Sequence, residues 1–582
     1  MELAEARWSL DPRERSAWAS TLLSCGLGLL YVLWLIYTSR EVGIPRDESV
    51  YLYAADRISG WLSWSSAQGV DPLSLRGVER GFGFNHEHPA LLKELFALSH
   101  SYLHVKWGLI ADPTLAYRLP TMLLSALTVS LTSALGARLA GLWAGLGAGV
   151  ALMAMPRLFF HAHLACFDAP VMAMWLLIVL SYLRAYHQGG GWVLLSGVTL
   201  GLGLATKLNA TFAPFLLLGV SLIHLLGLKR AHSSELGWTV KRYAWIGGSM
   251  ITLGLGVFWL HWPWLYHDVW ARLLGYIQFH ARHEHYPVDY FGALYYRPPL
   301  PVSFPFVMLG LTVPLVTLTL GLFGMIEALK RGVSRWRERP EGFPVELLLL
   351  VNFIFALVLI ALPSTPIFGG TKHWITSLPF LAIFAGVAFE RARATLLQSA
   401  TALISVTRLR GQLISLSFVA LCFAPAVSWT QSYGPHGPVW YNSLIGGPSG
   451  AAEARLPRDF WGYSSVKVLS TLNERATPKA GVFWHNATGA SVWRYQRDGR
   501  LRRDLRSTGD WTGPYADWGV YHSQREKRAE ELDLWWAYGT TLPVEGYFVD
   551  GVQVIGLYQR AQTATQGASD DNSQSPDTQR AW

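Results

Sequence analysis

Eleven long uncharged stretches are the feature that most constrains how this chain folds. Most have roughly 16–25 residues, enough for a helix to cross about 30 Å of hydrocarbon. In lipid, a backbone must satisfy its own hydrogen bonds, so such stretches become helices. The stretches are residues 18–38, 119–137, 139–155, 169–183, 191–206, 208–228, 243–260, 302–326, 347–362, 374–389 and 411–428. The sequence therefore predicts a mainly α-helical, polytopic membrane protein with about eleven transmembrane helices.

The composition supports this class. Hydrophobic residues make up 51% of the 582 residues and charged residues only 15%, whereas soluble domains are about a quarter charged. The net charge of +9 does not indicate nucleic acid, because the basic residues lie in short loops between the apolar stretches. Cys25, Cys166 and Cys422 are widely separated and have no CxxC spacing, which excludes a disulfide framework. The predicted partner is a lipid bilayer and not nucleic acid.

The basic loops predict the orientation in the membrane. Arg7, Arg13 and Arg15 precede the first stretch, which we interpret as a retained anchor with a cytoplasmic N-terminus. Alternating sides from there places every short basic loop in the cytoplasm, as the positive-inside rule requires. The sequence predicts a multi-pass cell-membrane protein whose C-terminal domain is external, in the periplasm.

Changes in composition along the chain also predict its domain boundaries. Residues 1–428 are predicted to form the transmembrane domain, with an external loop at 39–118. After residue 428 the chain turns rich in Gly, Pro, Asn, Asp and Arg with short apolar runs, which predicts a small external α/β domain at 429–560. Residues 561–582, rich in Gln, Ser and Thr, are predicted to be disordered. Apolar residues at helical spacing in 90–105 predict an amphipathic helix lying in the membrane interface.

Polar and ionisable residues gather on the predicted external face. Such groups are costly at the ends of spans unless they serve a solvated site. Asp47 and Glu48 follow the first span, and a carboxylate there can act as a general base. Arg118, Lys207 and Lys372 are cations at external span ends, suited to an anionic substrate group.

Several strings on this face resemble one enzyme family. The acidic pair in RDESVY and the string EHPALLK resemble elements of protein O-mannosyltransferases and of the aminoarabinose transferases that modify lipid A. These belong to glycosyltransferase family 39 and its relatives, membrane enzymes of the C-type fold that use polyprenyl-phosphate sugars. YRLP, FDAP and GGTKHW match further family elements. Ala90 departs from the family pattern, which has a second proline there.

The resemblance implies a membrane glycosyltransferase, mannosyltransferase-like, acting at the external face. Its donor is a sugar on polyprenyl phosphate. Its acceptor is a hydroxyl of a protein, lipid or glycan, which attacks the anomeric carbon of the sugar with inversion. Asp47 is the predicted base, and Glu48 is predicted to orient it or hold the acceptor. The predicted ligands of the donor phosphate are Arg118, Lys207 and Lys372. The predicted substrate contacts are Glu87, His88, Lys93, Asp168 and His373.

Two alternatives stay open at the level of sequence. External histidines, with Glu87 and Glu284, form clusters that suit zinc or manganese. No cofactor is certain and no metal ligand is assigned, with a divalent metal as the open alternative. A transporter or lipid flippase would also have many spans, but transporters tend to carry inverted repeats and mid-membrane charges. The sequence has no evident repeat and its charges lie at span ends, which favours the enzyme.

The orientation is tested by reporter fusions. Fusions after residues 235, 335 and 400 should be cytoplasmic, and fusions after 80, 285 and 440 external, because the basic loops alternate with the apolar stretches. Reporter activity on each side of the membrane provides the measurement. A single reversed fusion would mean a miscounted span.

Overall fold

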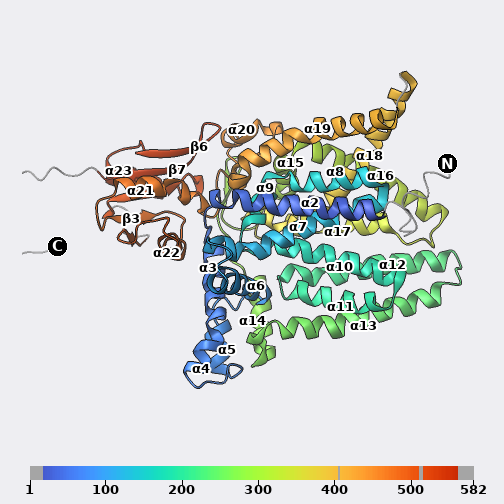
Figure 1. Cartoon of the computed structure of the whole chain (residues 1–582), viewed down its shortest axis with the longest axis horizontal. Coiled ribbons are helices and arrows are strands. Elements are labelled where there is room, and N and C mark those ends of the chain that lie inside the picture. Colours follow the sequence, from blue (N-terminus) through green and yellow to red (C-terminus); the bar gives the residue numbers. More distant parts are fainter. Residues whose placement is uncertain (1–16, 404–406, 510–514, 561–582) are drawn as a thin grey trace, which may run out of the picture.

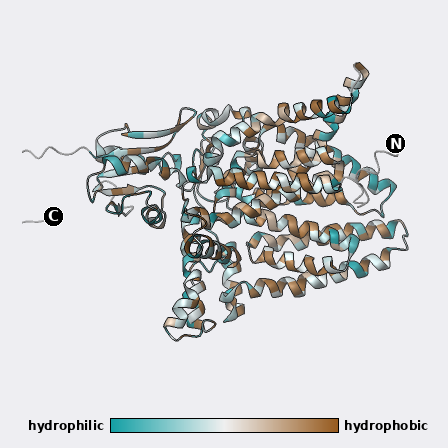
Figure 2. Ribbon diagram, in the orientation of Figure 1, coloured by the Kyte–Doolittle hydropathy of each residue, from teal (hydrophilic) through white to brown (hydrophobic). Residues whose placement is uncertain are grey.

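The computed structural model describes residues 17–403, 407–509 and 515–560. A bundle of long helices carries a small sheet domain at one end, here called the sheet-domain end (Figure 1). Figure 2 shows that the bundle helices are mostly hydrophobic and the sheet domain more hydrophilic. This confirms the predicted fold class. The bundle helices are α2 (Ala17–Thr38), α7 (Pro113–Ala140), α8 (Leu142–Met153), α9 (Pro156–His163), α10 (Asp168–Gln188), α11 (Gly191–Leu204), α12 (Ala213–Arg230), α13 (Leu236–Leu260), α15 (Phe304–Thr312), α16 (Leu315–Glu338), α17 (Val345–Ala361), α18 (Leu378–Leu403) and α19 (Arg408–Tyr433).

Each predicted apolar stretch is largely helical, but not every one is a single full-length span. Within the described residues, seven helices are long and apolar enough to cross a membrane alone. An eighth span results if α8 and α9, bent by 71°, are counted as one. Helices α11 and α17 are shorter, with 14 and 17 residues. The predicted stretch 302–326 is divided between α15 and α16.

The interruptions have local causes. Pro156 begins α9 and Pro314 precedes α16, and proline cannot donate the backbone hydrogen bond that would continue a helix. Gly141 lies between α7 and α8 with a φ of 92°, a conformation that glycine adopts without steric cost. The chain therefore reverses within one residue between α7 and α8.

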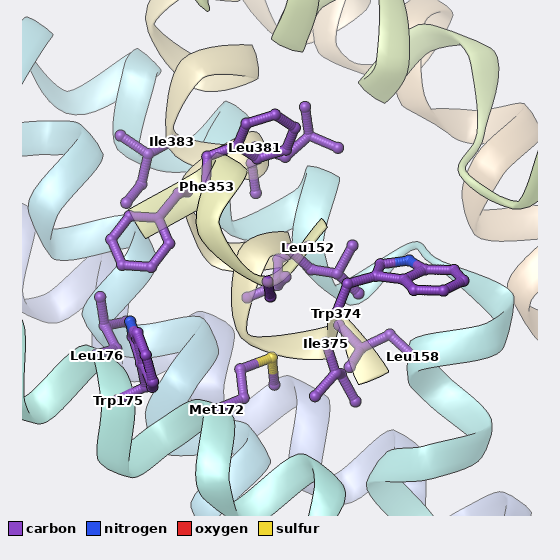
Figure 3. Packing of buried hydrophobic residues seen from close by; sticks show 14 of the residues in the cluster. Leu152, Leu158, Met172, Trp175, Leu176, Phe353, Trp374, Ile375, Leu381 and Ile383 are labelled. Carbon is purple, nitrogen blue, oxygen red and sulfur yellow. The ribbon is translucent and has the colours of Figure 1, made fainter. Parts of the chain in front are cut away.

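The interior of the bundle is a continuous apolar core (Figure 3). Leu152 of α8, Trp175 of α10, Phe353 of α17 and Leu381 of α18 are among its buried side chains. The indole Nε1 of Trp175 donates a hydrogen bond of 2.8 Å to Oδ1 of Asn352. This bond satisfies two polar groups that would be costly in such a core.

Helices α8 and α18 approach closely through small residues. Gly386 of α18 faces Ala144 and Ala148 of α8, and a Cβ built at Gly386 would lie only 2.7 Å from the Ala148 backbone nitrogen. Small residues are typical where membrane helices gain stability from close packing.

The first loop and two later segments lie at the sheet-domain end. The loop forms α3 (Arg46–Ser59), α4 (Trp61–Ala67), α5 (Leu75–Phe82) and α6 (Leu91–Ser99), followed by a π-helical turn, His100–Lys106. Further along the chain, α14 (Val269–Ala281) precedes an antiparallel hairpin of β1 (Val288–Tyr290) and β2 (Ala293–Tyr295). The predicted helix at 90–105 is present, but Leu92 and Phe96 are buried in a protein cluster. Leu98 and Val105, by contrast, are 53% and 67% exposed.

The sheet domain is a mixed α/β unit, as predicted. Its strands are β3 (Gly481–Trp484), β4 (Arg506–Thr508), β5 (Trp518–His522), β6 (Glu545–Val549) and β7 (Val552–Gln559), in the order β4-β3-β5-β7-β6. Strand β3 is parallel to β4 and β5, and β7 is antiparallel to β5 and β6. The helices are α20 (Gly447–Glu453), α21 (Leu469–Arg475), α22 (Gly489–Arg497) and α23 (Arg528–Tyr538). The predicted disordered tail, 561–582, lies outside the described residues.

Ion pairs fix the sheet domain to the first loop. Asp56 of α3 accepts hydrogen bonds from Arg494 at 2.9 Å and Arg497 at 3.3 Å, both on α22. Tyr117 of α7 also donates to Asp56. Ile44, just before α3, is buried in the apolar core of the sheet domain. The loop between α2 and α3 therefore belongs to both parts of the molecule.

The close contact of α8 and α18 predicts a stability effect. Gly386→Ala should lower the free energy of unfolding by about 1–3 kcal/mol, because the added methyl overpacks the contact. Gly219→Ala on α12 is the matched control, since nothing lies within 4 Å of its Cβ position. The measurement is the thermal unfolding midpoint in detergent. Equal midpoints for the two variants would contradict the packing described.

Candidate functional site

A buried ion pair organises the sheet-domain end of the bundle. Arg118 of α7 is paired with Glu48 of α3 through two bonds, Nε to Oε1 at 2.8 Å and Nη2 to Oε2 at 2.7 Å. The two side chains are only 1% and 0% exposed. Glu48 Oε1 also accepts a bond of 2.8 Å from the backbone nitrogen of Ala165. The pair joins α3, α7 and the segment between α9 and α10.

The remaining donors of Arg118 bind backbone carbonyls of the α2–α3 connection. They reach the oxygens of Ser39 at 3.2 Å, Val42 at 2.9 Å and Gly43 at 2.7 Å. An arginine has five N–H donors, and all five are used. This arrangement corrects the prediction that Arg118 contacts the donor phosphate, because no N–H is left for it. Glu48 is likewise enclosed, which suits the predicted orienting role and not contact with an acceptor.

Asp47, next to Glu48, points away from this pair. Its side chain is 38% exposed, and Oδ2 lies 3.5 Å from Nζ of Lys372. That separation is longer than a strong ammonium–carboxylate hydrogen bond. Asp47 and Lys372, predicted as base and phosphate ligand, are thus brought together, and the carboxylate stays accessible.

Three aromatic rings surround the ammonium of Lys372. Its Nζ lies 4.3 Å from the ring centroid of Trp461, 4.8 Å from that of Phe368 and 5.3 Å from that of Phe460. A cation within about 6 Å of a ring face is attracted by the ring quadrupole. The three rings stabilise the ammonium group without accepting conventional hydrogen bonds from it. Its N–H groups are therefore more available to a ligand than those of Arg118.

A second ion pair lies at the same end. Lys207, between α11 and α12, has Nζ 2.5 Å from Oδ1 of Asp168, the first residue of α10. Lys207 is 19% exposed and Asp168 only 7%. The predicted residues Asp47, Lys372, Asp168 and Lys207 therefore form two carboxylate–ammonium pairs.

The polar side chains of the EHPALLK segment mostly form hydrogen bonds within the protein. Lys93 is buried and donates to the carbonyls of Asn85 at 2.7 Å and His88 at 2.8 Å. Burial lowers the pKa of its ammonium to about 7. Glu87 accepts a bond of 2.6 Å from the Asn85 side chain. The contacts of Lys93 fix the turn that carries Glu87 and His88.

His88 faces aromatic side chains. Its ring is near those of Tyr51 on α3, Phe167 before α10 and His280 on α14. Burial lowers the pKa of His88 well below its usual range, so the ring is neutral at pH 7. Its Nδ1 is buried without a hydrogen-bond partner among the described residues. Among the predicted substrate contacts, His88 has a polar atom that a ligand can satisfy.

The predicted histidine and metal sites have weaker support. His373 contacts the Phe368 carbonyl through Nε2, and burial lowers its pKa to about 3. Within the ranges that the structure describes, no group of three or more His, Cys, Asp or Glu side chains is placed to hold a metal ion. The chemistry derived below uses no metal.

The sequence interpretation did not assign the aromatic residues of the sheet domain to the site. Trp461 and Phe460 lie in the string DFWGYSS, and nothing local in this string shows that they reach Lys372. The backbone nitrogen of Arg46 donates to the Trp461 carbonyl at 3.0 Å. Ser49 and Thr488 share a bond of 2.7 Å. The first turn of α3, which carries Asp47, is therefore held by the sheet domain.

Asp459 fixes the turn that presents these two rings. Its carboxylate accepts from the Phe460 backbone nitrogen at 2.7 Å and from Ser464 Oγ at 2.8 Å. Burial raises the pKa of Asp459 to about 7. The turn is thus positioned by short local bonds, and its rings cover Lys372.

The comparisons agree with the family resemblance. Residues 104–264 match the family model described as dolichyl-phosphate-mannose-protein mannosyltransferase. This range contains Arg118, Asp168 and Lys207. No curated protein matches the chain in sequence. The match confirms the resemblance over this region and indicates a membrane glycosyltransferase, in preference to the transporter alternative.

Solved structures show a distant likeness over most of the chain. The chain is similar to ArnT from Cupriavidus metallidurans bound to undecaprenyl phosphate, with 14% identity, 94% of this chain and 98% of ArnT covered, and a TM-score of 0.46. It is also similar to the Archaeoglobus fulgidus oligosaccharyltransferase in the apo form, with 11% identity, 91% and 72% covered, and a TM-score of 0.49. Each likeness covers more than nine-tenths of this chain.

The Arg118–Glu48 pair predicts a loss of stability and not of donor binding. Glu48→Gln should lower the free energy of unfolding by about 3–5 kcal/mol, because it leaves the Arg118 charge buried without its partner. Asp47→Asn, one residue away and accessible, should unfold near the wild-type midpoint. The measurement is thermal unfolding in detergent. A stable Arg118→Ala variant with only a raised donor KM would restore the phosphate role.

Proposed function

We propose that this protein transfers a sugar from a polyprenyl-phosphate donor to an acceptor hydroxyl at the external face of the membrane. One observation carries the proposal: an accessible carboxylate, Asp47, lies 3.5 Å from a lysine, Lys372, whose ammonium is held by aromatic rings. A base and a cation side by side suit a reaction that removes a proton and releases an anion. The mannosyltransferase family match over 104–264 supports the same reaction class.

Asp47 is the proposed general base. As the acceptor oxygen attacks the anomeric carbon, its proton passes to an oxygen of Asp47, which is exposed enough to meet a hydroxyl. Glu48 acts as a positioning residue. Its bonds to Arg118 and Ala165 hold the first turn of α3, so the neighbouring Asp47 carboxylate does not turn inward.

Lys372 and Lys207 are the proposed partners of the leaving phosphate. As the new glycosidic bond forms, the bond between the anomeric carbon and the phosphate oxygen breaks. Its electron pair stays on that oxygen, and polyprenyl phosphate leaves. A single displacement of this kind inverts the sugar. Cations placed beforehand where negative charge develops lower the barrier most in a partly dehydrated site.

The donor supplies its own membrane anchor. A polyprenyl tail dissolves in the bilayer, and its phosphate lies near the membrane surface. ArnT of Cupriavidus metallidurans, to which this chain is similar, is described as bound to undecaprenyl phosphate, which agrees with such a donor. The acceptor is proposed as a hydroxyl of a protein, lipid or glycan.

Asp47→Asn should abolish most of the transfer while the protein stays folded. Loss of a general base costs about 10² to 10⁴ in rate, and asparagine keeps the size of the side chain. Initial rates with a polyprenyl-phosphate sugar and a hydroxyl acceptor provide the measurement. Glu41→Gln, an exposed carboxylate before α3, is the matched control and should keep wild-type turnover. Wild-type turnover in Asp47→Asn would exclude Asp47 as the base.

Lys372→Gln should lower kcat by about 10² to 10³, because a preorganised donor at the developing charge is lost. The variant retains a polar side chain of similar length. Rates measured over a range of donor concentrations separate this effect from donor affinity. An unchanged kcat and donor KM would leave Lys372 without a role at the phosphate.

A further inference from the structure

A second site lies at the other end of the bundle. A cavity of about 240 Å³ opens between α12, α16 and the start of α17, at the end away from the sheet domain (Figure 1). Apolar side chains line most of it, together with Arg335, Arg339 and Glu346. The apolar lining residues include Ile223, Leu329, Val333, Trp336, Leu347 and Leu350.

The walls of this cavity are held by specific contacts. His224 of α12 shares a hydrogen bond of 3.0 Å with the carbonyl of Glu341. Gly227 lies against Pro340 and Trp336, so that any Cβ at 227 would clash with them. The connection between α16 and α17 is therefore fastened to α12, and the cavity is a built feature of the fold.

One polar atom in the cavity wall lacks a partner. Glu346 is only 1% exposed, and its Oε2 accepts a bond of 3.2 Å from Nη1 of Arg335. Its Oε1 is buried and accepts no hydrogen bond among the described residues. A buried carboxylate oxygen without a donor is costly. Gly332 also lines the cavity, and a Cβ built on it would lie 3.5 Å from the Cβ of Glu346.

The residues that line the cavity indicate which kind of ligand it can bind. Ile223, Leu329 and Val333 are 37%, 57% and 44% exposed, so the apolar side of the cavity is open to the surroundings of the bundle, as an acyl chain requires. The guanidinium groups of Arg335 and Arg339 line the cavity, and guanidinium geometry suits a phosphate. The ligand should also carry a hydrogen-bond donor for Glu346 Oε1, which accepts no hydrogen bond among the described residues. A choline headgroup fits poorly, because it has no N–H and places a cation near two arginines.

We infer that this cavity binds an anionic phospholipid with a hydroxyl-bearing headgroup, in the leaflet opposite the sheet domain. An acyl chain lies along Ile223, Leu329 and Val333. The phosphate binds Arg335 and Arg339, and a headgroup hydroxyl donates to Glu346 Oε1. The site is independent of the proposed transfer reaction.

Native mass spectrometry of the purified full-length protein tests this inference. The probes are phosphatidylglycerol, phosphatidylmethanol and phosphatidylcholine with the same acyl chains. Phosphatidylmethanol has the same charge as phosphatidylglycerol but no hydroxyl. Phosphatidylglycerol should bind about tenfold tighter than phosphatidylmethanol, equivalent to one hydrogen bond to a charged group, and phosphatidylcholine should bind weakest.

A cavity-filling variant distinguishes lipid bound in this cavity from lipid bound elsewhere on the protein surface. Val333→Trp places an indole at the cavity wall and should remove the preference for phosphatidylglycerol. Phe323→Trp lies on the same helix, is 69% exposed and does not line the cavity, so it should keep the preference. Leu329→Trp repeats the test at a second position, and thermal unfolding without added lipid verifies that each variant is folded. Equal binding of phosphatidylglycerol and phosphatidylmethanol, or a preference that survives in both filled variants, would overturn the inference.

Discussion

The buried bond between Arg118 and Glu48 is the interaction on which the candidate site depends. It joins α7 of the bundle to α3 of the first loop, and the same guanidinium holds three carbonyls between α2 and α3. Desolvation offsets much of the attraction in a buried ion pair, so its main contribution here is a fixed geometry. Because Glu48 is turned inward, the adjacent Asp47 faces Lys372.

The sheet domain completes this geometry. Its turn at Asp459–Ser464 supplies rings that cover Lys372, and its backbone accepts a bond from Arg46 beside Asp47. Asp47 and Lys372 are therefore positioned by parts of the chain that lie far apart in the sequence and meet at one end of the bundle. The ion pairs of Asp56 with Arg494 and Arg497 hold the sheet domain in this position.

The sequence predicts the helices well, because lipid allows an apolar backbone few alternatives. It predicts their ends less well, since Pro314 divides between α15 and α16 the stretch 302–326 that hydropathy alone joins. Asp47, Lys372, Asp168 and Lys207 could be chosen as charges at external span ends. Arg118 has the same signature, yet its partner Glu48 lies 70 residues away, and only the fold distinguishes a paired cation from an available one. Trp461 has no local feature that indicates its contact with Lys372.

Lys372, beside Asp47, is proposed to meet the donor phosphate. Phosphorus-31 NMR of a polyprenyl-phosphate sugar, titrated with purified protein, tests it most directly. The bound phosphate of the wild type should give a shifted resonance, because a nearby ammonium changes its electronic environment. Lys372→Gln should move that resonance toward the free position, whereas a substitution of Lys229, at the far end of α12, should not. The same shift in wild type and Lys372→Gln would contradict the account.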